Sequence, residues 1–171
     1  MKNRPTFILA CFALLLAIGP ALRGAQAGPE ALIARARAVL KTPEPPREAI
    51  TKALVDALDA ALLILPKTDY AEEFKFRVTA VRKMFEAGAL FEDKVRQYLG
   101  LAYKLVSGGK TWEIPAELKA ADSTKKGIEK AVDLCAKLLD SALAERNAGR
   151  NEAACRDLVS FVILVITPIE A

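Results

Sequence analysis

Two acidic residues one helical turn apart are the first candidates for chemistry in this sequence. Asp56 and Asp59 lie in a helical pattern, so their carboxylates would lie on one side of the helix. A carboxylate pair performs general acid–base catalysis when a cleft shifts the pKa of one member. Counting about 100° per residue places both opposite the apolar stripe Ile50–Leu54–Leu58, in contact with water. The pattern favours two solvated surface charges over a catalytic pair.

Histidine is absent from all 171 residues. Its absence excludes Ser-His-Asp and Cys-His nucleophile pairs and His-ligated zinc, copper or haem. The sequence also lacks a Cys-x-x-Cys pair, a Gly-x-Ser-x-Gly turn and a calcium-binding loop. We therefore expect no catalytic residue, no metal site and no cofactor. An enzyme that assembles carboxylate, Lys or Tyr chemistry from several helices stays an alternative, because sequence spacing does not exclude it.

Cys135 and Cys155 are the two thiols of the chain after its first 27 residues. An oxidising compartment favours a disulfide between them. Two antiparallel helices that turn near Gly149 would instead separate them by about 12 Å along the helix axis. Because a disulfide needs Cα atoms within about 7 Å, two separately buried thiols are the favoured interpretation, and a disulfide is the alternative.

The first 27 residues have the pattern of an export signal. Lys2 and Arg4 precede an apolar run over residues 7–18, and residues 25–27 have the small-x-small pattern that a signal peptidase cuts. The run is shorter than the roughly 20 apolar residues that a membrane anchor needs. We therefore expect cleavage after Ala27.

Cleavage would change the charge of the protein. The whole chain has 25 basic and 21 acidic residues, a formal net charge of +4. Loss of Lys2, Arg4 and Arg23 leaves 22 basic residues and a net charge of +1, so nucleic acid is not an expected partner. The expected mature protein is a single domain over residues 28–171, periplasmic or secreted, without an integral membrane span.

Helical periodicity runs through this mature chain, and no stretch alternates like a half-buried strand. Short connections indicate antiparallel neighbours. We expect an all-α fold, an up-and-down bundle of about four long helices plus one or two short ones, with the first helix packed across it. The expected helices lie between residues 28 and 40, 46 and 66, 69 and 88, 91 and 108, 122 and 147, and 151 and 168.

The ends of these helices carry specific signals. Asp69 and Glu72 have capping-box spacing, Gly88 is expected to end the third helix, and Asn151 is expected to cap the last one. Phe161–Ile166 is apolar on every side and too short to span a bilayer, so we expect that helix end inside the bundle.

Surface charges and a short repeat complete the pattern. Glu73 and Arg77 form one of five acid–base pairs at i,i+4 spacing, which is favourable on a solvated helix face. Residues 50–54 (Ile-Thr-Lys-Ala-Leu) resemble residues 128–132 (Ile-Glu-Lys-Ala-Val). A match of this length arises easily by chance, so we do not infer a duplication.

Three apolar side chains are candidates for a contact surface. Phe76 and Leu63 project from polar faces of their helices, although packing under another helix is the favoured interpretation of both. Trp112 lies in an irregular stretch, where a lid over the bundle end is favoured over an exposed binding anchor.

The preferred function is an exported, non-catalytic helical module that binds another envelope protein or supports an envelope assembly. The first alternative is a carrier of an apolar small molecule. Eight of the nine aromatic residues after Ala27 lie between Tyr70 and Trp112, and a ligand would be expected between helices of this aromatic-rich half.

Overall fold

The protein is described by a computed structural model over residues 27–65, 67–119 and 125–167, so residues 1–26 of the expected signal peptide lie outside the described part. The described residues form seven helices and no strand, which confirms the all-α prediction. The helices are α2 (Pro29–Val39), α3 (Arg47–Ile64), α4 (Ala71–Glu86), α5 (Asp93–Val106), α6 (Ala116–Lys119), α7 (Lys125–Asn147) and α8 (Asn151–Ile166).

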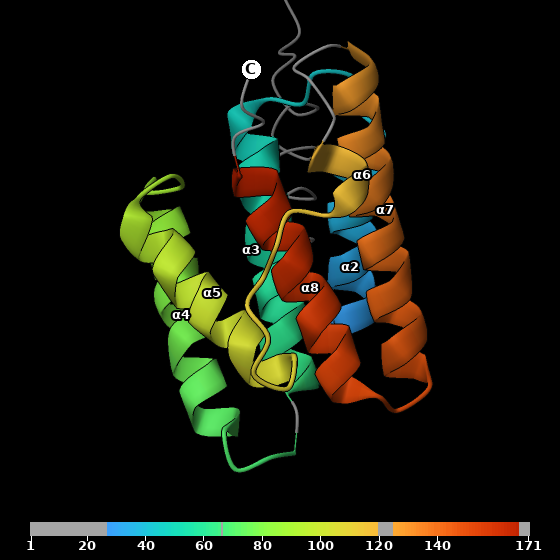
Figure 1. The fold of residues 1–171 in the computed structure, drawn as a ribbon. Helices are drawn as coiled ribbons and strands as arrows, with labels where there is room; N and C mark the ends of the chain where they lie inside the picture. Colours follow the sequence, from blue (N-terminus) through green and yellow to red (C-terminus); the bar gives the residue numbers. More distant parts are fainter. Residues whose placement is uncertain (1–26, 66, 120–124, 168–171) are drawn as a thin grey trace, which may run out of the picture.

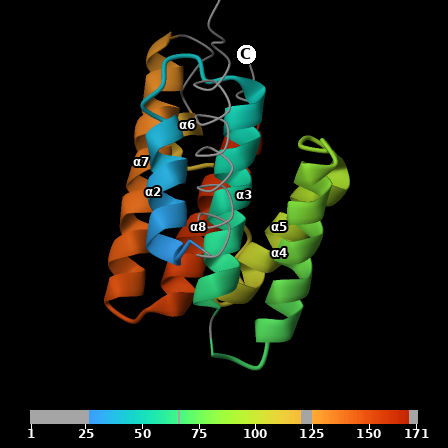
Figure 2. The same cartoon turned by 180° about the vertical axis from the view of Figure 1, so that it is seen from behind.

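The long helices form three layers (Figures 1 and 2). α3 and α8 pack against each other in the middle, α2 and α7 cover one side of this pair, and α4 and α5 cover the other. Neighbouring helices run antiparallel, as expected for an up-and-down bundle. The first helix does not cross the bundle as expected. α2 runs alongside α3 and α7 and is a full member of its layer.

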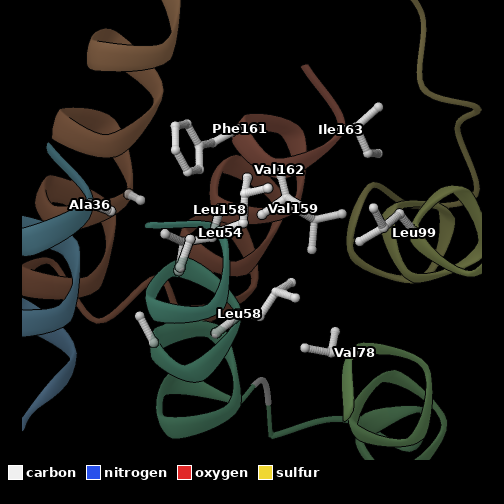
Figure 3. Close-up of a cluster of buried hydrophobic side chains, with 14 of the residues drawn as sticks. Ala36, Leu54, Leu58, Val78, Leu99, Leu158, Val159, Phe161, Val162 and Ile163 are labelled. Carbon is white, nitrogen blue, oxygen red and sulfur yellow. The ribbon is translucent and has the colours of Figure 1, made fainter. Parts of the chain in front are cut away.

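The central pair belongs to two four-helix groups at once, α2-α3-α8-α7 and α3-α4-α5-α8. α8 is therefore buried on both sides. Phe161 points toward α7 and Ile163 toward α5 (Figure 3), and the side chains from Leu158 to Leu164 are all buried. The expectation that the apolar end of this helix lies inside the bundle is confirmed. α3 makes the same two-sided contact with small residues, Ala57, Ala60 and Ala61, that let neighbouring helices approach closely.

The helix ends differ in part from expectation. Gly88 ends α4 with a φ of +84°, a conformation that glycine adopts without strain. The prediction of a capping box at Asp69 and Glu72 is wrong. α4 begins at Ala71, and its N-cap residue Tyr70 makes no side-chain capping bond. Asn151 does not cap α8 either. It is the first residue of α8, and its Nδ2 donates a hydrogen bond to the Ile64 carbonyl oxygen at 3.2 Å.

Helical periodicity predicts that Phe91 and Ile128 lie on the apolar stripes of their helices, yet both are exposed. Phe91 precedes the first residue of α5 and is 61% exposed, and Ile128, in the first turn of α7, is 52% exposed. Both lie near a helix end, where fewer neighbouring helices cover the stripe. Within the described ranges, no helix is long and apolar enough to cross a membrane.

Candidate functional site

An aromatic pair joins α4 and α5, in which Phe76 is exposed and Tyr98 is partly buried against the core. Phe76 projects away from the buried line of α4 and is 57% exposed. Its ring centroid lies 6.2 Å from that of Tyr98 on α5, with the planes tilted by 45°. Leu101 follows Tyr98 by three residues on the same side of α5 and is also exposed. We call Phe76, Tyr98 and Leu101 the aromatic surface.

Cations hold the rings of the aromatic surface in place. The Arg77 guanidinium lies 5.2 Å from the Tyr98 ring centroid and 6.0 Å from that of Phe76. Lys94 Nζ lies 5.8 Å from the Tyr98 ring centroid. Arg77 Nε donates to Glu73 Oε1 at 2.7 Å, which confirms the predicted i,i+4 pair and fixes the guanidinium over both rings. The rings and the cation therefore form an ordered surface.

A hollow of about 320 Å³ adjoins Phe76 on α4. The surface of this hollow is mostly apolar, and the charged side chains beside it are two lysines and one glutamate. Its lining is Glu72, Lys75, Phe76, Thr79, Ala80 and Lys83. Packing under another helix, the favoured interpretation of Phe76, is wrong, because the ring is more than half exposed and none of the described helices covers it.

Leu63 does not join this surface. It is 47% exposed near the end of α3, where it lines a separate groove of about 450 Å³ with residues 27–29, Arg146 and Asn151. Packing under another helix is therefore wrong for Leu63 as well. The structure places the two candidate contact residues on different faces, and they do not form one docking site.

Trp112 lies between α5 and α6 and is partly buried against the hydrophobic core. Leu118 of the one-turn helix α6 is buried in the same connection, and α6 packs on α7. Trp112 therefore contributes to covering the core, and it adds no exposed anchor to the aromatic surface.

The carboxylates Asp56 and Asp59 do not face water as expected. Asp56 is only 5% exposed and accepts two hydrogen bonds from Arg35 of α2, at 2.7 and 3.0 Å. Asp59 is partly buried and pairs with Arg82 of α4. The prediction treated α3 as a helix with one buried face, whereas α2 and α4 cover two more of its sides. Each carboxylate binds a different arginine, so the two do not form a catalytic pair.

Cys135 and Cys155 are free thiols, buried in different places. Cys155 Sγ lies 3.5 Å from the Ala61 carbonyl oxygen, between α8 and α3, and Cys135 lies near the middle of α7. Burial raises the pKa of both thiols to about 12, which keeps them protonated and unreactive near neutral pH.

The other buried acid is also neutralised by close partners. Asp157 of α8 accepts a hydrogen bond from the Ser141 hydroxyl at 2.6 Å and forms an ion pair with Arg156 at 3.1 Å.

The Tyr70 hydroxyl donates a hydrogen bond to Glu152, and burial is the main cause that raises the pKa of Tyr70 to about 12. The described residues hold no group of three His, Cys, Asp or Glu side chains placed to bind a metal ion.

No protein-family model matches the chain, and neither a curated protein nor a solved structure matches it. Sequence reasoning selected Phe76 but missed Tyr98, Arg77 and Lys94. The available signal was the spacing of Lys94, Tyr98 and Leu101, which lie at i, i+4 and i+7 on one side of α5.

Proposed function

We propose that this protein is an exported, non-catalytic helical module that binds another protein of the cell envelope through the aromatic surface. The observation that carries the proposal is Phe76, a large apolar side chain that is more than half exposed and yet held by Tyr98 and Arg77. Aromatic and arginine side chains supply most of the binding energy at protein interfaces.

The order of the aromatic surface supports a binding role. Binding costs entropy when side chains must be immobilised, and the ion pair with Glu73 favours the position of Arg77 over the two rings. Lys75 and Lys83 beside Phe76, and Lys94 over Tyr98, add positive charge around an apolar centre. The partner that fits is a protein segment with an apolar side chain flanked by carboxylates.

The assignment to the envelope rests on the N-terminal pattern. The basic start, the apolar run and the small residues before Gly28 are typical of a cleaved export signal. N-terminal sequencing of the protein from its own cell should find Gly28 first, in the envelope or the medium. An intact Met1 on protein recovered from the cytosol would refute export.

Photo-crosslinking in the producing cell tests the binding proposal. A photoreactive amino acid at position 76 should crosslink to one protein, and the same group at Ile114, which is 42% exposed between α5 and α6, is the control. The crosslinked protein is then purified and its affinity measured. Phe76→Ser should weaken binding at least about tenfold, or 1.4 kcal/mol, and Ile114→Ser should leave it unchanged. Equal affinity of both variants would refute the proposal.

The charged part of the interface has its own test. Lys94→Glu should slow association with the partner more than it speeds dissociation, because rim charges act mainly on the encounter. The same measurement at higher salt should reduce the difference from the natural protein, since salt screens exposed charges. An unchanged association rate would remove the acidic partner from the proposal but leave the apolar contact at Phe76.

A further inference from the structure

A cavity of about 320 Å³ lies at the end of the bundle where α3 and α7 begin and α2 and α8 end. All four helices contribute to its walls, which include Leu54, Phe161 and Leu164. The cavity is thus in the four-helix group away from α4 and α5. The carrier hypothesis expected a ligand in the aromatic-rich half, whereas only Phe161 of the lining is aromatic.

The two similar sequence segments form opposite walls of this cavity. Residues 50–54 lie at the start of α3 and residues 128–132 at the start of α7, and three residues of each line the space: Ile50, Ala53 and Leu54, and Ile128, Ala131 and Val132. The lysine of each segment is exposed. The alanine in each wall leaves room that a larger side chain would fill. The repeated pattern therefore supplies the same three lining positions on both sides of the cavity.

Polar atoms in the lining are few and uncharged. Among the described residues that line the cavity, none carries a charge, and only Cys135 and Thr167 have polar side chains. The Thr167 hydroxyl already donates to the Ile163 carbonyl oxygen at 2.7 Å, and the buried Cys135 thiol stays protonated. A charged group in this space would lose its hydration without gaining a partner.

The size of the cavity suits a small hydrocarbon group. Protein interiors rarely leave voids larger than a water molecule, because lining atoms without neighbours lose attractive contacts. An apolar cavity of about 150 Å³ stays dry and binds benzene. The present cavity is about twice as large, and it opens to solvent beside Ile128, which is 52% exposed.

We infer that this cavity binds the hydrocarbon chain of a small apolar or amphiphilic molecule, with any polar head group outside the mouth beside Ile128. The inference goes beyond the proposed function, because the cavity and the aromatic surface belong to different layers of the bundle. A ligand here would stabilise the native protein in proportion to its free concentration.

The test uses the purified protein and three probes: 1-octanol, sodium octanoate, and a phosphatidylcholine with two six-carbon tails below its micelle concentration. At least one should raise the melting temperature in a saturable manner. A response to octanol or octanoate alone points to a free small molecule, and a response to the phospholipid points to a lipid tail. Both outcomes support the hydrocarbon site, whereas no saturable shift with any probe refutes it.

Matched variants locate the binding site. Ala131→Phe fills the cavity and should weaken probe binding at least tenfold, with an unchanged or higher melting temperature. Ala144→Phe places the same side chain on an exposed position of α7 and should bind like the natural protein. Equal binding by both variants would refute the site.

Thiol labelling in the natural sequence avoids any dependence on the folding of a variant. Bound probe should slow the alkylation of Cys135, which lines the cavity, by a severalfold larger factor than that of Cys155, which it protects only by stabilising the native protein. Equal slowing of both thiols would indicate general stabilisation and refute the assignment to this cavity. A further variant, Ile169→Ser, tests whether the four residues after Thr167 fill the cavity in place of a ligand. If probes bind only to that variant, the inference is wrong.

Discussion

The two outer layers of the bundle cover the same central helices in different ways. The α2–α7 layer places ion pairs between its helices and toward α3: Arg35–Asp56, Arg37–Asp140 and Arg146–Glu30. The α4–α5 layer has one such pair toward α3, Arg82–Asp59, packs Phe74 and Phe85 inward and exposes Phe76 beside Tyr98 and Arg77.

The two layers therefore place their apolar side chains differently with respect to the core and to solvent. In the α2–α7 layer, apolar side chains face inward and still leave a cavity of about 320 Å³ at one end. In the α4–α5 layer, Phe74 and Phe85 are buried, whereas Phe76 is exposed to solvent. Packing of the described residues does not explain the open cavity or the exposure of Phe76, and we therefore propose binding at both.

The largest expected effect concerns the inward face of the α4–α5 layer. Phe74 is completely buried, and Phe74→Ala should lower the free energy of unfolding by about 3–5 kcal/mol through lost burial and a new cavity. Urea denaturation followed by circular dichroism measures the change. We expect one transition, because both layers share α3 and α8. Two separate transitions would show that the layers fold independently.

Loss of the arginine should cost more stability in the buried ion pair between α2 and α3 than in the exposed pair between α2 and α7. Arg35 is half exposed, whereas the Asp56 side chain is 7% exposed. Arg35→Met should cost about 2–3 kcal/mol, because it leaves a buried carboxylate without its cation. Arg37→Met breaks the more exposed pair with Asp140 and should cost less than about 1 kcal/mol. Equal losses in urea denaturation would contradict the distinction between buried and exposed pairs.

The buried thiols should make the protein less stable at alkaline pH. Burial raises their pKa from 9.0 to about 12, so the unfolded chain releases these protons at lower pH than the native protein. The free energy of unfolding should therefore fall between about pH 9 and 12, by roughly 1.4 kcal/mol per pH unit for each thiol. Cys135→Ala and Cys155→Ala should each remove part of this slope. If the variant with both substitutions loses stability with pH as steeply as the natural protein, the two thiols are not the cause.

The smallest expected effect concerns the outward face of α4. Phe76→Ala should lower the free energy of unfolding by about 1 kcal/mol or less, since the ring is mostly in solvent and loses only its contacts with Tyr98 and Arg77. Phe74→Ala, two residues earlier on the same helix, is the reference. A similar loss for both variants would show that Phe76 is there for stability and would weaken the binding proposal.

Sequence periodicity predicted the all-α class and most helix limits because each helix has a clear apolar stripe and a glycine or proline stop. It misjudged residues that depend on neighbouring helices. The periodicity of one helix shows its most apolar face but not how many helices cover it. Asp56 therefore looked solvated, although α2 buries it, and Ile128 looked buried, although it lies at the mouth of the cavity.

The candidate sites were predictable only in part. Phe76 was identifiable because a phenylalanine stood on a polar helix face, but Tyr98 meets it from another helix. The cavity was not identifiable, because residues 50–54 and 128–132 gain a common role only when α3 and α7 begin at the same end of the bundle.

The shared central position of α8 also bears on the order of events during synthesis. α8 follows the other described helices in the chain, and both four-helix groups require it. Until Asn151–Ile166 has left the ribosome, neither half can close its core, and Leu54, Leu58 and Leu99 lack their main partner. The nascent polypeptide thus exposes apolar helix faces until α8 has emerged, which makes aggregation a risk during that interval.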